Sequence, residues 1–156
     1  MNANELYADY KTKMQKIADV KYAAAVLQWD QETYLPTKGN NFRGRQLATL
    51  SELAHQQFTT ESMGVLLNEL NNKEDLAGNE KRNVQLSLED YNRNKKLSSD
   101  FVRKISESVT IAYHAWVKAR NDNSFTGFQQ PLHALIDLKK QKLICWVTNI
   151  TLITLS

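Results

Sequence analysis

Apolar side chains recur at steps of three and four along the first 27 residues of the chain. They are Leu6, Tyr10, Met14, Ile17, Val20, Ala24 and Leu27. This spacing places them on one face of a long helix. Pro36 has no amide proton and disfavours helical geometry at Leu35, so the helix is expected to stop near Tyr34. A helix with one apolar face gains its stability from packing, so partner helices are expected.

The helical pattern continues in shorter runs along the rest of the chain. The predicted buried positions are Leu47, Leu50, Leu53, Ala54 and Phe58 in a second helix, Leu66, Leu67 and Leu70 in a third, Val84, Leu88 and Tyr91 in a fourth, and Phe101, Ile105, Val109, Ala112, Trp116 and Ala119 in a fifth. Thr59 or Thr60 can cap the third helix, and Ser98 or Ser99 can open the fifth. Residues 71–79 form the clearest loop.

Glycine and proline are scarce, with five glycines and two prolines in 156 residues. Few tight turns are therefore available, which favours helices joined by short polar links. After a break at residues 121–125, Pro131 is tolerable in the first turn of a sixth helix, expected over residues 131–142. We predict an all-α fold, a helical bundle of about six helices.

Charge and hydropathy restrict the partners. The net charge is +3, from 20 basic and 17 acidic residues that are interspersed. No basic stretch alternates with aromatic residues as a base-stacking surface does, so no nucleic acid is expected. No segment has the roughly 20 apolar residues that span a bilayer, and the first residues lack the apolar core of a secretory signal. Cys145 is the only cysteine, so no internal disulfide can form. We expect no membrane partner and a cytoplasmic location.

The residues around the histidines and the cysteine do not match a known catalytic motif. His55, His114 and His133 do not form the HExxH pattern of zinc peptidases. His133 and Asp137 are four residues apart and could clip a metal, but such a pair is more often a hydrogen bond on a helix surface. Cys145 has no histidine nearby in sequence. From the residues alone we predict no catalytic residue and no metal ligand.

The stretch LQWDQETYLP, at residues 27–36, crowds acids and aromatics at the end of the first helix. Asp30 and Glu32 are two residues apart, so they point about 200° apart on a helix and cannot form a carboxylate pair. Either acid can cap a loop or pair with Arg43 or Arg45. The alternative is that the stretch is one edge of a site whose other parts lie elsewhere.

This stretch and several others resemble the carboxypeptidase Taq family of zinc metallocarboxypeptidases. LQWDQETYLP resembles the WDQETYMP-like motif of that family, and RGRQLATLSELAH, at residues 43–55, resembles the helix that follows it. Supporting similarity occurs in DYNRNKKLSSDFV at residues 90–102 and in AYHAWVKARNDNSF at residues 112–125. The resemblance covers about residues 5–142, which we interpret as the helical N-terminal region of a larger, mainly helical metallopeptidase.

The resemblance implies a deep groove that holds zinc or another divalent metal and a reaction that removes single C-terminal residues from peptides. It also implies a possible homodimer. Trp29, Asp30, Glu32 and Tyr34 are the motif residues that could lie at the groove edge. In the family the metal is held by HExxH histidines and a downstream glutamate, which lie beyond the matched region. We therefore expect no cofactor in this chain and an inactive fragment; the alternative is a stand-alone helical module that binds other proteins.

The last residues, LICWVTNITLITLS at 143–156, are uncharged and differ from everything before them. A reading shifted by one frame from the codon of Lys142 permits ADLLGYEHHPYNA, which resembles the family's continuation. We interpret residues 143–156 as an out-of-frame tail. Its alternating pattern and its β-branched residues are typical of a strand, but continuation of the sixth helix through Leu143 and Trp146 is also possible. We expect the tail to pack on the bundle or on another chain.

Overall fold

The computed structural model describes residues 2–76 and 78–148. The elements are α1 (Ala3–Thr33), the short 3-10 helix η1 (Thr37–Gly39), α2 (Asn40–Phe58), α3 (Glu61–Asn71), α4 (Gly78–Asn94), α5 (Ser99–Asn121) and α6 (Thr126–Val147). The residues described contain six α-helices and no strand, which confirms the predicted all-α bundle. None of these helices has the length and apolarity needed to cross a bilayer.

Local signals set both ends of α1, and the sequence analysis predicted the second of them. The Asn2 side chain accepts the Glu5 amide at 2.8 Å, and the Glu5 carboxylate accepts the Asn2 amide at 3.1 Å. These reciprocal bonds satisfy two amides that a helix start leaves unpaired. At the other end α1 stops at Thr33, with Tyr34 as the capping residue, before the ring of Pro36.

The structure also decides which residue caps α3 and which caps α5. Thr60, not Thr59, caps α3, because its side-chain oxygen accepts the Met63 amide at 3.3 Å. Ser98, not Ser99, caps α5 through the Phe101 amide at 3.2 Å. Extended backbone at both caps aims the hydroxyl at the first helical turn.

The sixth helix begins earlier and ends later than predicted. α6 starts at Thr126, so Pro131 lies in its interior and not in its first turn. The missing amide of Pro131 would have bonded the carbonyl of Gly127, which is exposed and can bond water instead. The helix then continues to Val147, which selects the helical alternative for residues 143–147. Residues 149–156 of the proposed tail lie outside the described residues.

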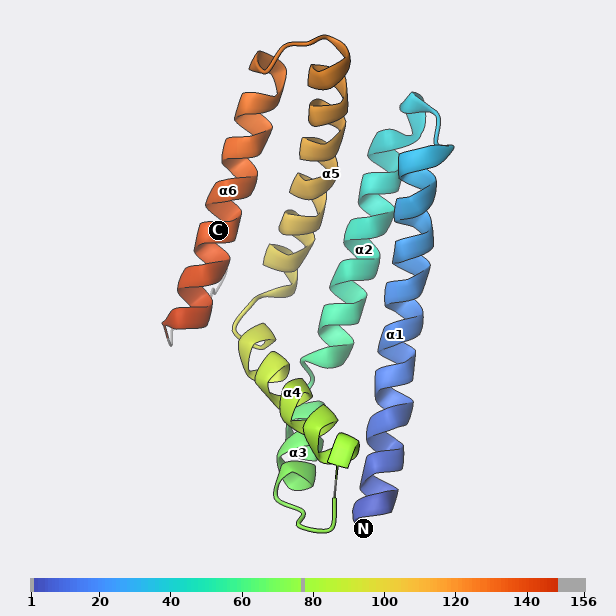
Figure 1. The fold of residues 1–156 in the computed structure, drawn as a ribbon, viewed down its shortest axis with the longest axis vertical. Coiled ribbons are helices and arrows are strands. Elements are labelled where there is room, and N and C mark those ends of the chain that lie inside the picture. The colour runs from blue at the N-terminus through green and yellow to red at the C-terminus, as the bar shows by residue number, and fades with distance from the viewer. Residues whose placement is uncertain (1, 77, 149–156) are drawn as a thin grey trace.

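The four long helices lie side by side in one layer (Figure 1). α1 packs on α2, α2 on α5, and α5 on α6, and no other pair among these four packs extensively over residues 2–76 and 78–148. The short helices α3 and α4 pack on each other at one end of the layer, where α3 also contacts α1.

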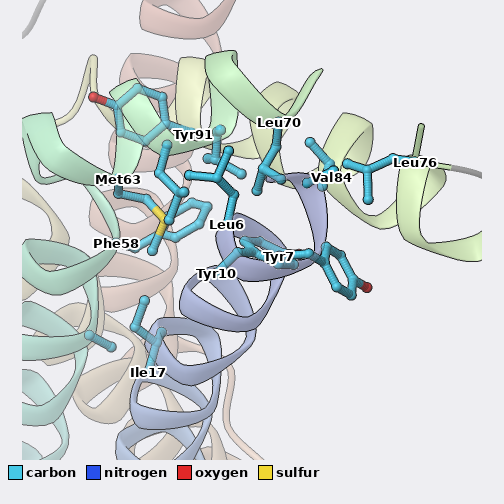
Figure 2. Packing of buried hydrophobic residues seen from close by; sticks show 14 residues of the cluster. Leu6, Tyr7, Tyr10, Ile17, Phe58, Met63, Leu70, Leu76, Val84 and Tyr91 are labelled. Atoms are coloured by element: carbon cyan, nitrogen blue, oxygen red, sulfur yellow. The ribbon is translucent and has the colours of Figure 1, made fainter. Parts of the chain in front are cut away.

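The main core lies at that end, between the first half of α1 and helices α3 and α4 (Figure 2). Its fully buried side chains include Ile17, Met63, Leu67, Leu70 and Val84. A smaller cluster joins Leu97 and Phe101 to Leu138 and Cys145 of α6, so the beginning of the predicted tail packs on the bundle.

The single layer explains where the predicted core positions are wrong. Val109 and Trp116 of α5 are 37% and 40% exposed, and Leu53 of α2 is 42% exposed. Each lies on the apolar side of its helix, but no second layer of helices covers that side in the part of the chain described. Periodicity predicts the apolar face of a helix and does not supply its partner.

Candidate functional site

The aromatic residues of the LQWDQETYLP stretch lie on the surface at the end of α1. Trp29 is 57% exposed and Tyr34 is 74% exposed. Their rings meet edge to face, with centroids 5.5 Å apart. This arrangement is a favourable aromatic pair, and it presents a broad apolar surface to solvent.

Asp30 pairs with Arg43, one of the two structural partners that the sequence suggested. The Asp30 Oδ2 atom lies 2.6 Å from Nη1 of Arg43. The same Nη1 donates to the carbonyl of Leu27 at 2.6 Å, and the Nε atom donates to Gln46 at 3.0 Å. Arg43 is only 12% exposed, so this contact ties the end of α1 to the first turn of α2. Asp30 therefore has a structural role.

Glu32 is separate from Asp30, as their spacing requires. It is exposed and accepts a hydrogen bond from Gln28, one turn earlier, at 3.1 Å. Between the two acids, Gln31 is buried, with 8% of its surface exposed. Its Oε1 atom has no hydrogen-bond partner among the described residues. The sequence offered no signal for this buried amide, because its neighbours on both sides are polar.

The three histidines belong to three different helices. His55 of α2 is buried and its Nε2 donates to the carbonyl of Leu97 at 2.9 Å. Burial lowers the pKa of His55, and the nearby Lys142 lowers it further, against the opposing effect of the Leu97 hydrogen bond. His114 of α5 is half-buried, and burial lowers its pKa as well. His133 of α6 is exposed.

The described residues do not offer a metal site. Residues 2–76 and 78–148 contain no group of three or more His, Cys, Asp or Glu that could hold an ion. Asp137, the second member of the possible clip with His133, lies 3.8 Å from the ammonium of Lys140. Three or more such side chains are what protein zinc sites require. No catalytic step can be assigned through a metal to these residues.

A groove runs between α1 and α5, with α2 as its floor. Two adjoining cavities of about 350 and 260 Å³ form it, and both are lined by Lys21, Ala24 and Ser51. Leu47 extends the floor at one end and Phe58 at the other. We call this feature the α1–α5 groove. Its lining combines apolar and polar groups from all four helices of the layer.

Comparison with known proteins identifies the family of the chain. The carboxypeptidase Taq (M32) metallopeptidase family matches residues 9–151. Carboxypeptidase 1 of Bacillus subtilis is 26% identical over 134 residues, which are 85% of this chain and 27% of that protein.

Solved structures agree with this match. The M32 carboxypeptidase of Deinococcus radiodurans is 30% identical, with a TM-score of 0.70 over 92% of this chain and 29% of that chain. The BsuCP crystal structure has a TM-score of 0.87 at 24% identity, over 91% of this chain and 29% of that one, which supports the fold. The chain thus spans little more than a quarter of the length of these relatives. It belongs to the carboxypeptidase Taq (M32) metallopeptidase family.

Proposed function

We propose that this chain is the N-terminal helical region of a metallocarboxypeptidase that releases C-terminal amino acids from peptides. The observation that carries the proposal is the family match over residues 9–151, combined with coverage of only 27% of the Bacillus subtilis relative. The chain has the size and fold of one part of such an enzyme. The LQWDQETYLP stretch would then lie at the edge of the substrate groove, with Trp29 and Tyr34 exposed there.

We further propose that the 156-residue chain does not hydrolyse peptides by itself. A zinc ion lowers the pKa of bound water from about 15.7 to about 7, which is worth on the order of 12 kcal/mol in forming the nucleophile. The described residues have no group that could hold such an ion, and the sequence has no HExxH. Asp30, the first of the two acids in the motif, is already paired with Arg43.

The metal and partners of the complete enzyme follow the family resemblance. We infer zinc or another divalent metal, peptide substrates, a possible homodimer and a cytoplasmic location. The second candidate function, a stand-alone module that binds another protein, is favoured by the exposed apolar side chains Tyr22, Val26 and Trp29.

A chimera tests the first proposal. Residues 9–142 of this chain would replace the corresponding part of the matched segment of Bacillus subtilis carboxypeptidase 1. Release of C-terminal amino acids from blocked peptides would be measured with and without a chelator. We expect metal-dependent release by the chimera and none by the 156-residue chain with added zinc. Release by the purified 156-residue chain would refute its inactivity. An inactive chimera with native-like helicity would favour the stand-alone module.

We also infer that residues 143–156 are read out of frame. The uncharged composition of this tail supports the inference, although α6 continues through Val147. The family match extends to residue 151, so it spans the point where the frame is proposed to change. The nucleotide sequence decides the matter. A shifted frame that encodes LLGY and then PYNA would support the inference, and a shifted frame without them would end it.

A further inference from the structure

The middle of α1 is mostly apolar and yet exposed. Seven of the nine residues from Lys21 to Trp29 are apolar. Tyr22 is 71% exposed and Val26 is 64% exposed, and they point away from the groove side of the helix. Exposed apolar side chains that gather on one surface mark a place where another structure packs. In the part of the chain described, α1 packs on α2 and α3.

The α1–α5 groove beside this segment has the dimensions of one helix. Its floor extends along α2 from Leu47 to Phe58, twelve residues that rise about 16 Å, or three helical turns. The small side chains of Ala24 and Ser51 lie between the walls, so the backbone of a further helix could approach closely. Ile105 and Val109 of α5 supply apolar contacts from the opposite wall. The groove is suited to a helix that lays an apolar face into it.

One end of the groove contains a buried acceptor that lacks a donor. Gln31 lines the cavity between α1, α2 and α5, and its Oε1 atom has no hydrogen-bond partner among the described residues. A buried polar atom without a partner is costly, and native proteins almost always satisfy it. A donor that comes from outside the described helices would satisfy it. Ser106 and Tyr113, on the opposite wall formed by α5, make the surroundings polar.

The cavity of about 350 Å³, which reaches Phe58, is positively charged. Lys21 and Lys142 both line it, and neither has a carboxylate within 4.0 Å among the described residues. Burial lowers the pKa of Lys142, and repulsion by Lys139 lowers it further. The nearest acid that lines the cavity is Asp90, which is exposed. A carboxylate brought between the two lysines would offset this charge.

We propose that the α1–α5 groove binds one amphipathic helix from the polypeptide that follows this region in the longer family members, with a carboxylate placed at Lys21 and Lys142 and a hydrogen-bond donor placed at Gln31. The inference rests on the proposed function. The occupant follows from two observations: the chain spans only 27% of the Bacillus subtilis relative, and its long helices form a layer without a second layer. A helical layer needs another layer to bury its apolar face.

Synthetic peptides test this proposal directly. Overlapping peptides of about 20 residues, long enough for a stable bound helix, would cover the part of Bacillus subtilis carboxypeptidase 1 outside the matched 134 residues. Each would be titrated into the ¹⁵N-labelled 156-residue chain. We expect one acidic, amphipathic segment to bind, with the largest amide shifts at Ala24, Ser51 and Ile105.

Charge reversal separates the groove from general attraction. The double variant Lys21→Glu, Lys142→Glu should weaken binding of that peptide at least tenfold. The matched control Lys118→Glu, Lys140→Glu reverses two exposed lysines outside the groove, 78% and 70% exposed, and should stay within twofold. Far-UV circular dichroism would verify that both variants remain helical.

Three results would overturn the proposal: no peptide binds, the amide shifts map outside the groove, or both double variants weaken binding equally. Dimerisation of the chain through the groove, seen by sedimentation, with no peptide bound would also overturn it. An active chimera without a groove-binding peptide would remove this inference and leave the proposed function standing. An inactive chimera with native-like helicity would count against the proposed function, and this inference, which rests on it, would fall with it.

Discussion

The contact between Asp30 and Arg43 gives the sharpest prediction, because it decides whether the motif's first acid is structural. Replacing Arg43 with Met removes the partner of Asp30 and the donor to the Leu27 carbonyl, while it keeps part of the side-chain volume. Charge-assisted hydrogen bonds contribute about 1.5–3 kcal/mol each, and Asp30 is 35% exposed, which screens its share. We expect a loss of about 2–3 kcal/mol in the free energy of unfolding.

The measurement is urea unfolding followed by far-UV circular dichroism, together with thermal melts. At about 2–4 °C per kcal/mol for a chain of this size, the melting temperature should fall by about 4–12 °C. The double-mutant cycle of Arg43→Met with Asp30→Asn should show a coupling of about 1 kcal/mol. As a control, Arg45→Met removes an exposed arginine that stacks on the Phe42 ring, and it should change stability by less than about 0.5 kcal/mol.

A coupling free energy below about 0.5 kcal/mol would refute the structural assignment of Asp30, because the additivity of independent sites is no better than that. The carboxylate would then be free for another role, and the groove-edge interpretation of the motif would regain weight. Raising the salt concentration gives a further check. The coupling should shrink only in part, since Arg43 is 12% exposed and a buried pair is screened less than a surface pair.

Three further predictions concern packing, pH and helix geometry. Gly64→Ala should lower the free energy of unfolding by about 1–3 kcal/mol in urea titrations, because the added methyl would clash with the Tyr91 hydroxyl. No loss of stability would mean that the Tyr91 ring moves freely. Burial lowers the pKa of His55 below 6.5 in the folded state, so the unfolded chain binds more protons and stability should decrease as the pH falls from 6.5 toward that lower pKa. His55→Gln should flatten this slope in urea midpoints measured from pH 7.5 to 5, and an unchanged slope would contradict the assignment. Pro131→Ala should raise the melting temperature, because the new amide can donate to the Gly127 carbonyl. The net gain in the free energy of unfolding should be about 1–2 kcal/mol, after subtraction of the entropy that the unfolded chain regains without proline. A lower melting temperature would show that the proline ring itself is needed.

The candidate site was predictable only in part. The spacing of Asp30 and Glu32 excluded a carboxylate pair, and the structure places them with different partners. The choice of Arg43 over Arg45 required the packing of α1 on α2, because both arginines lie on the same helix a short distance apart. The buried Gln31 was missed altogether. A residue flanked by exposed polar neighbours carries no sequence signal of burial.

What the amino-acid sequence determined by itself is the set of helices and most of their ends. Pro36 stops α1, and the hydroxyls of Thr60 and Ser98 cap the helices that follow them, because these effects act within one turn of the backbone. Only the tertiary structure decided which apolar faces are covered. The layer leaves Trp116 and Tyr22 exposed although their helices are apolar there. A periodic pattern specifies the direction of a side chain, whereas its burial depends on a neighbour from elsewhere in the fold.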